Sequence, residues 1–198
     1  MHTNSELLFS SHARHMFRPE CQVLETGPGS FPSSFRKLIS NEAAQWDTVD
    51  IFENPQLTYS NAEENMFPIP DYRYAVVLAA QVIEHVRRPW VWLKEVARVS
   101  KPGGHVVLVC PVSWPYNTAP LDCCRIYSDG MKALLENAGL KTIKCLFESQ
   151  ELPGYKQYTP GVSPECQSKL LRTFFRLAGP LWFPVERAYD TLATAAKK

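Results

Sequence analysis

The sequence predicts an α/β fold built on a doubly wound, mostly parallel sheet, and three observations carry this prediction. Over Cys21–Phe35 a short apolar run leads into a glycine turn and then into a segment that can be helical. The runs Tyr74–Ala80 and His105–Cys110 are continuously apolar, which is typical of strands buried on both faces. From Pro89 to Val99 apolar residues recur at helical spacing, which predicts a helix between those two strands.

Composition limits the class of protein. The chain has 198 residues, 45% of them hydrophobic, which suffices for one well-cored domain with appendages. A formal net charge of +1 gives no basic field for a nucleic acid. The six cysteines form no C-x-x-C pair, residues 1–16 lack an apolar signal core, and no apolar run is long enough to span a membrane. We therefore expect a soluble, cytoplasmic protein with reduced thiols.

The glycine turn is the first candidate for a ligand site. Gly27 and Gly29 permit a tight turn and a close approach of ligand to backbone. Ser33 and Ser34 are candidate N-caps of the helix that follows. The dinucleotide fingerprint G-x-G-x-x-G is not met, because its third glycine position holds Pro32.

A second strand is expected at Trp46–Phe52, and its end carries a carboxylate. Asp50 lies 25 residues beyond Glu25, near the spacing at which an acid reaches the hydroxyls of a ribose. Glu53 is the rival acid, and a solvated strand-end aspartate is the alternative to any binding role. Leu57–Ser60 predicts a short third strand, so close to the second that the usual intervening helix is lost or reduced to a turn.

The second half of the chain continues the alternation of helices and strands. Lys101–Gly104 is expected to end the helix that starts at Pro89 with a glycine stop. Asp129–Leu140 predicts another amphipathic helix, and Lys141–Phe147 alternates as a strand does.

The predicted organisation has three parts. Residues 1–20 form an N-terminal lead-in, mobile or covering the substrate; residues 21–150 form the main domain; residues 151–198 form a loop and a helical C-terminal cap. The cap is expected as helices over 165–178 and 181–195, with no obvious further strand. Its aromatic and basic residues leave open a second interpretation, an amphipathic pair that contacts a membrane surface or a partner.

Several motifs occur together in order and resemble one family. Glu25, Gly27 and Gly29 form an acid-x-Gly-x-Gly motif, Gln81–Val86 is similar to a V-L-E-H-V block, and Glu95–Gly104 is similar to an R-x-L-K-P-G-G block. Together they resemble the class I S-adenosylmethionine-dependent methyltransferases over about residues 21–140, and a later D-x-x-R segment resembles one broad subgroup. The resemblance implies a Rossmann-like fold.

The resemblance also implies a site. The residues expected to bind S-adenosylmethionine, and its product S-adenosylhomocysteine, are Glu25, Gly27, Pro28, Gly29, Asp50, Ile51, Asn61, Ala62 and Gln81. Those expected to frame the acceptor are Trp114, Tyr116, Asn117 and Tyr127. His85, Asp122 and Arg125 are the catalytic candidates, with two alternatives left open: a structural role for His85, and a mutual Asp122–Arg125 salt bridge that orients the loop. No metal site is expected.

The implied function is methyl transfer to an oxygen or nitrogen of a small-molecule acceptor, a natural product or a carrier-held group among them. Two alternatives remain. The departures at Thr26, Pro28 and Ala75 favour a methyltransferase-like cofactor-binding protein without activity. The aromatic tail favours a membrane-associated enzyme acting on a lipid or quinone. No nucleic-acid partner is expected, and the thin sheet face and apolar tail are compatible with a homodimer.

Overall fold

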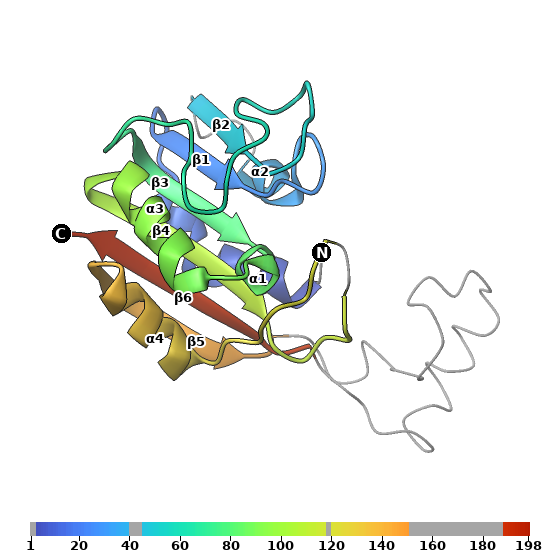
Figure 1. The fold of residues 1–198 in the computed structure, drawn as a ribbon. Coiled ribbons are helices and arrows are strands. Elements are labelled where there is room, and N and C mark those ends of the chain that lie inside the picture. The colour runs from blue at the N-terminus through green and yellow to red at the C-terminus, as the bar shows by residue number, and fades with distance from the viewer. Residues whose placement is uncertain (1–2, 40–44, 118–119, 151–187) are drawn as a thin grey trace, which may run out of the picture.

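A six-stranded sheet forms the centre of the fold (Figure 1) in the computed structural model, which describes residues 3–39, 45–117, 120–150 and 188–198. The strand order is β2-β1-β3-β4-β6-β5. The strands are β1 (Gln22–Thr26), β2 (Gln45–Val49), β3 (Tyr74–Ala80), β4 (Ser100–Pro111), β5 (Leu140–Glu148) and β6 (Asp190–Lys197). Neighbouring strands from β2 to β4 are parallel, and β6 runs antiparallel to both β4 and β5. The predicted α/β fold with a mostly parallel sheet is confirmed.

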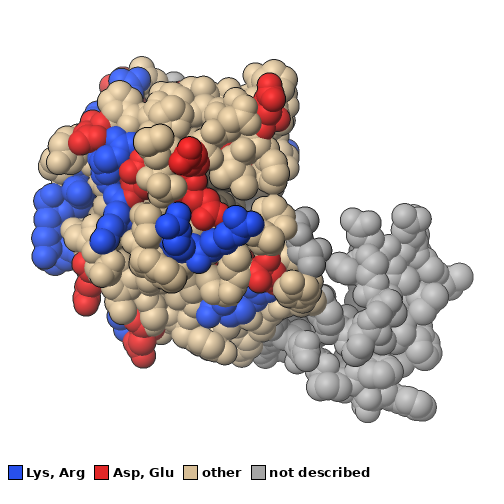
Figure 2. Space-filling view, in the orientation of Figure 1, with Lys and Arg blue, Asp and Glu red and all other residues tan. Residues whose placement is uncertain are grey.

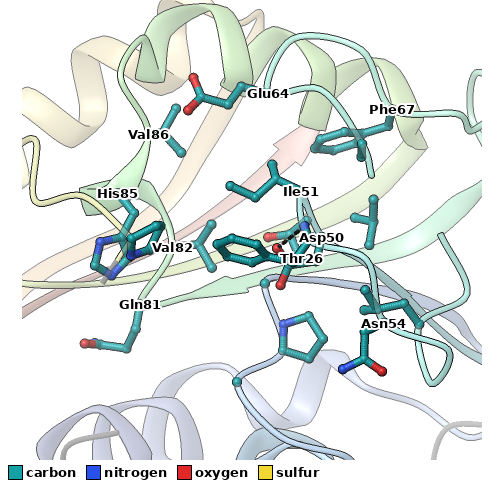
Figure 3. A pocket seen from close by; sticks show the side chains of 18 of the residues that line it. Thr26, Asp50, Ile51, Asn54, Glu64, Phe67, Gln81, Val82, His85 and Val86 are labelled. Carbon is teal, nitrogen blue, oxygen red and sulfur yellow. Dashed lines mark hydrogen bonds between the residues drawn. The ribbon is translucent and has the colours of Figure 1, made fainter. Parts of the chain in front are cut away.

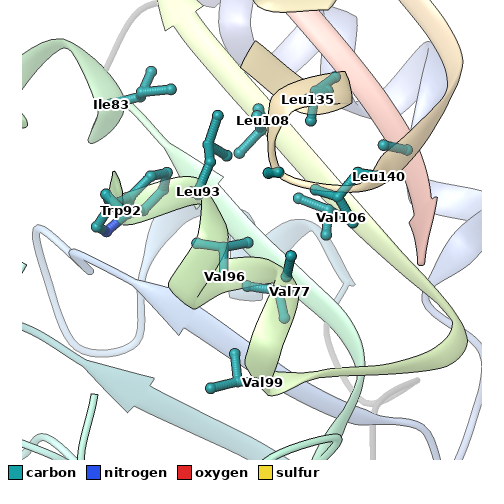
Figure 4. Close-up of a cluster of buried hydrophobic side chains, with 14 of the residues drawn as sticks. Val77, Ile83, Trp92, Leu93, Val96, Val99, Val106, Leu108, Leu135 and Leu140 are labelled. Carbon is teal, nitrogen blue, oxygen red and sulfur yellow. The ribbon is translucent and has the colours of Figure 1, made fainter. Parts of the chain in front are cut away.

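Helices cover both faces of this sheet. The helical elements are α1 (Thr3–His12), α2 (Ser34–Ile39), α3 (Pro89–Val99), α4 (Ser128–Asn137) and the 3₁₀ turns η1 (Arg14–Met16) and η2 (Ile83–His85). Buried side chains of α3 and α4 form one apolar cluster with the sheet (Figure 4), and those of α1 and α2 form a second cluster on the other face. The result is a three-layer arrangement with helices on the two outer layers.

The strands β3 and β4 read as continuously apolar because each contributes to both clusters. Val77 and Leu108 lie in the cluster of α3 and α4, whereas Leu78 and Val107 lie in the cluster of α1 and α2. All four side chains are fully buried. Alternate residues of a strand point to opposite faces, so a strand covered on both sides needs apolar residues at every position.

The helix α3 begins as predicted but ends differently. Pro89 occupies its first turn, and the helix ends at Val99, where Ser100 takes an extended conformation. The predicted glycine stop is wrong, because Gly103 and Gly104 lie inside β4. A Cβ on Gly104 would lie 3.0 Å from the carbonyl oxygen of Ala75, so this glycine allows β4 to approach the start of β3. By contrast Gly139, with φ +75°, follows α4 as a glycine stop should.

The predicted third strand at Leu57–Ser60 is wrong in extent. The structure has a single parallel bridge there, between Tyr59 and Val49. Next to this bridge, hydroxyl groups of side chains take the place of backbone acceptors. The Thr58 amide donates to Thr48 Oγ1 and the Thr48 amide donates to Thr58 Oγ1, each at 3.1 Å. The expected loss of the intervening helix is confirmed, since residues 50–73 are described throughout and contain none.

The N-terminal segment is packed rather than mobile. Leu8 and Phe9 of α1 are fully buried in the second cluster, and Phe9 meets Phe17 and Phe35 edge to face. The helix forms because these apolar side chains are buried against the sheet, since its residues are otherwise mixed in character.

The C-terminal prediction needs a correction. The helix expected over 181–195 is contradicted at its described end, where Asp190–Lys197 forms β6 between β4 and β5. Leu192, Ala193 and Ala195 are fully buried there. Small side chains suit an inner strand covered by helices on both faces. The remaining predictions for the loop and helix over 151–187 lie outside the described residues.

The surface agrees with the near-zero net charge. On the face shown in Figure 2, acidic side chains lie beside basic ones. Within the described ranges, no helix combines the length and apolar character needed to cross a bilayer.

Candidate functional site

The glycine turn closes the end of β1. Gly27 has φ +62°, and its amide donates a 2.9 Å hydrogen bond to the carbonyl of Val49 at the end of β2. A Cβ on Gly27 would lie 2.6 Å from Cγ2 of Val82. A Cβ on Gly29 would meet nothing within 4 Å, because Gly29 faces open space. The backbone conformation and packing of the turn thus require glycine at position 27, whereas position 29 leaves open space beside the backbone.

The acid of the motif is buried and fixed. Ser33 Oγ and Trp46 Nε1 each donate a 2.8 Å hydrogen bond to Oε2 of Glu25. Ser33 also caps α2, accepting a 3.0 Å hydrogen bond from the amide of Arg36, which confirms it as an N-cap. Burial raises the pKa of Glu25 more than the two hydrogen bonds lower it. The carboxyl therefore holds the turn and α2 together.

A first cavity of about 490 Å³ opens beside this turn (Figure 3). Its walls include these residues predicted to bind the cofactor: Gly27, Pro28, Gly29, Asp50, Ile51, Ala62 and Gln81. Burial raises the pKa of Asp50, whose Oδ1 accepts a 3.4 Å hydrogen bond from the amide of Phe52. Asn61 is not among the wall residues; it is exposed, with φ +54°, and its neighbour Ala62 lines the cavity instead.

Sequence reasoning did not predict several of the residues that line this cavity. The additional lining residues include Thr26, Phe31, Asn54, Leu57, Glu64, Phe67, Val82 and Trp92. Phe67 lies in the loop before β3, where its amide donates a 2.7 Å hydrogen bond to Glu95 Oε1 and its carbonyl accepts one from Arg98. A motif search does not find such residues, because they belong to loops positioned by long-range contacts.

A second cavity of about 410 Å³ adjoins the first. The two share Gly27, Gly29, Gln81 and His85, at the ends of β1 and β3. The second cavity is otherwise bounded by polar groups that include Glu25, Glu84, Trp114, Asn117, Asp122 and Arg125. Ligands of open α/β sheets bind beyond the carboxyl ends of the strands, which is where both cavities lie.

Gln81 lies at the junction of the cavities in a left-handed conformation, φ +60°. Its amide donates to the Val109 carbonyl at 2.8 Å, and its side-chain Nε2 donates to Ser5 Oγ at 3.0 Å. Ser5 Oγ in turn donates to Asp190 Oδ2 at 3.1 Å, and Asn4 Nδ2 donates to the same oxygen at 2.8 Å. Thus α1 and β6 hold the end of β3, an arrangement with no local sequence signal.

His85 faces both cavities. Its Nδ1 is hydrogen-bonded to the carbonyl of Leu121, so Nδ1 carries the proton and Nε2 has a free lone pair in the neutral ring. The Nε2 atom lies 3.8 Å from Oε1 of Glu84. The geometry is thus compatible with both interpretations of His85, proton acceptor and structural tie to the 120s loop.

Asp122 and Arg125 pair with each other, as the salt-bridge alternative predicted. Both guanidinium nitrogens of Arg125 donate to the Asp122 carboxylate, and the amide of Asn117 donates to it at 2.7 Å. Arg125 also donates to the carbonyl of Cys124 at 2.9 Å. The pairing lowers the pKa of Asp122 and stiffens this wall of the second cavity.

The acceptor residues divide into two groups. Trp114 and Asn117 line the second cavity. Tyr116 is 77% exposed and lines neither cavity. Tyr127 points elsewhere, with its ring edge-to-face against Phe147 at 5.1 Å between centroids.

Glu84 is the acidic residue among those lining the second cavity that sequence reasoning did not select. Its side chain is 3% exposed, and burial raises its pKa to about 8. The available signal was its position beside His85 in the Gln81–Val86 block.

Comparison with known proteins identifies the family. A family model described as a methyltransferase domain matches residues 6–144, well over half of the chain. An uncharacterized methyltransferase of Mycobacteroides abscessus is 36% identical over 56 residues, which span 28% of this chain and only 22% of that protein.

Solved structures share the fold. The YcgJ protein of Bacillus subtilis superposes with a TM-score of 0.65 at 17% identity, covering 100% of this chain and 99% of that one. The 1,6-didemethyltoxoflavin-N1-methyltransferase of Burkholderia thailandensis, solved with 1,6-didemethyltoxoflavin and S-adenosylhomocysteine, gives 0.62 at 14% identity over 98% and 76% of the two chains. Together with the family match and the glycine turn, this similarity leads to one conclusion: the chain belongs to the class I S-adenosylmethionine-dependent methyltransferase family.

Proposed function

We propose that this protein binds S-adenosylmethionine in the first cavity and transfers its methyl group to an oxygen or nitrogen of a small molecule in the second. The observation that carries the proposal is the contact between the two cavities at Gly27, Gly29, Gln81 and His85. A donor and an acceptor bound on either side of this junction would have their reacting atoms next to each other.

The residues of the first cavity fit the cofactor. The open space beside Gly29 admits a ligand against the backbone of the turn. Asp50 offers two carboxylate oxygens to a vicinal diol such as that of ribose. Ile51, Ala62 and Phe67 supply apolar walls suited to a flat heterocycle such as adenine.

The chemistry needs positioning more than covalent help. S-adenosylmethionine supplies a methyl group on a positively charged sulfur, which a nucleophile displaces in line. The chain's part is to orient the nucleophile and exclude water. The Asp122–Arg125 pair fixes the wall on the acceptor side, and Trp114 and Asn117 bound the same space.

Calorimetric titration with S-adenosylmethionine and S-adenosylhomocysteine tests the cofactor site. Asp50→Ala should weaken binding by about 1–3 kcal/mol, since it removes charge-assisted hydrogen bonds to the ribose. Glu136→Gln, on the exposed side of α4, is the matched control and should bind as the wild type does. Failure of both ligands to bind the wild type would refute the proposal, and binding without transfer to any acceptor would favour a non-catalytic cofactor-binding protein.

A further inference from the structure

Glu84 has an unusual environment for a carboxyl group. It lies on η2 and lines the second cavity. Only 3% of its side chain is exposed, yet within the described part of the chain Oε2 has no hydrogen-bond partner. The Glu84 backbone is well anchored, since its carbonyl accepts hydrogen bonds from the amides of Cys123 at 2.8 Å and Cys124 at 3.3 Å.

An unsatisfied buried carboxyl oxygen is costly. Leaving a buried polar group unpaired costs about 1–3 kcal/mol, and more when the group is charged. The structural ties at this place are made by the backbone of Glu84, so the side chain is not needed for them. Glu84 lines the second cavity, so a ligand bound there is the partner that the geometry offers to this carboxyl group.

The charges around Glu84 specify the kind of ligand. Arg125 attracts the carboxylate form, but its guanidinium is engaged by Asp122. Asp122 and Asp190 of β6 oppose that form, and the thiols of Cys110 and Cys124 and the ring of His85 complete the surroundings. This environment suits a neutral group that donates a hydrogen bond and disfavours a carboxylate or a phosphate.

We propose that Glu84 accepts the proton of the methyl acceptor, and that the acceptor presents a neutral O–H or N–H group to the Glu84 carboxyl in the second cavity. The proposal rests on the proposed function. As the acceptor's oxygen or nitrogen bonds to the methyl carbon, the carbon–sulfur bond breaks and its electron pair stays on sulfur. The acceptor's proton passes to the Glu84 carboxylate, and the products are the methylated acceptor, S-adenosylhomocysteine and the carboxylic acid form of Glu84.

The protonation of Glu84 gives the step a characteristic pH dependence. Burial raises the pKa of Glu84 to about 8, so its carboxylate is the minor form at neutral pH. The rate of transfer at low acceptor concentration should therefore rise with pH and level off above about 8. If His85 were the base instead, Glu84→Gln would leave the pH profile of the rate unchanged.

The test uses the full chain with labelled S-adenosylmethionine and two pools of small aromatic compounds, one of phenols and anilines and one of benzoic acids. Glu84→Gln keeps the shape of the side chain and removes its basicity, so it should lower kcat/KM for the first pool by about 10²–10⁴-fold and abolish the rise in rate toward pH 8. Affinity for S-adenosylhomocysteine should not change. His85→Gln separates the two candidate bases, and Glu136→Gln is the surface control.

Each other outcome counts against the proposal. Full turnover by Glu84→Gln, together with loss of turnover in His85→Gln, would show that His85 accepts the proton. Weaker binding of S-adenosylhomocysteine by Glu84→Gln would make Glu84 a cofactor ligand instead. Labelling of the benzoic acids alone, or of neither pool while S-adenosylhomocysteine still binds, would overturn the acceptor class and leave the cofactor site of the proposed function standing.

Discussion

The buried carboxyl of Glu84 should make the stability of the protein depend on pH in a way that one substitution removes. The pKa of Glu84 is about 8 in the folded chain, against an ordinary value of 4.5. Between these two values the folded state holds a proton that the unfolded state has lost. The contribution is therefore fully present below about pH 4.5 and is lost as pH rises through 8.

The magnitude follows from the difference between the two pKa values. Each pKa unit corresponds to about 1.4 kcal/mol, so the gap from 4.5 to about 8 amounts to about 5 kcal/mol in full. Most of this loss in unfolding free energy falls between about pH 5 and about pH 8. A domain stable by about 5–15 kcal/mol would show such a change clearly.

The assay is urea unfolding of the ligand-free protein at pH values spanning this range, for the wild type, Glu84→Gln and Glu136→Gln. Other groups also titrate, so the measured quantity is the difference between variants at each pH. Glu84→Gln should gain stability relative to the wild type as pH rises, and Glu136→Gln should run parallel to the wild type. Parallel curves for Glu84→Gln would show that Glu84 titrates normally and would refute the reasoning.

Three further predictions concern the glycine turn, the N-cap of α2 and the loop before β3. Gly27→Ala should cost about 1–3 kcal/mol of stability through the left-handed strain and the clash, whereas Gly29→Val should leave the melting temperature unchanged and weaken S-adenosylhomocysteine binding. Equal effects of the two variants on melting and calorimetry would contradict this. Ser33→Ala should lower stability by about 1 kcal/mol in urea, since it removes the cap of α2; an unchanged midpoint would argue against the cap. Arg98→Met should cost about 2–3 kcal/mol, because charged hydrogen bonds to the loop before β3 are lost, and a loss below that would show a looser loop.

Local patterns carried the sequence predictions that succeeded. The strand, glycine turn and capped helix around Gly27 depend on neighbours in the chain, and the structure has them. The apolar runs of β3 and β4 could be recognised as strands from the local sequence alone. The wall residue Asp50 could be found because a strand end and a spacing rule coincide there.

The misses depend on contacts between distant residues. The hydrogen bonds that link Gln81, Ser5 and Asp190 connect residues 76 and 185 positions apart. No local pattern predicts such pairs, so the roles of α1 and β6 were not visible. Tyr127 was chosen as an aromatic near a motif, but Phe147 on β5 holds its ring away from the cavity.

The position of β6 also bears on how the chain folds as it is made. Among the described strands, β5 pairs only with β6, and β6 alone connects it to β4. Residues 188–198 are synthesised after every other element labelled in Figure 1. In the nascent chain β1 to β4 can therefore pair before β6 is made, whereas β5 has no strand to pair with until then. Closing such a distant pairing is slow because the loop entropy is lost before the contacts form. Truncation just before Asp190 would therefore leave β5 without a place in the sheet.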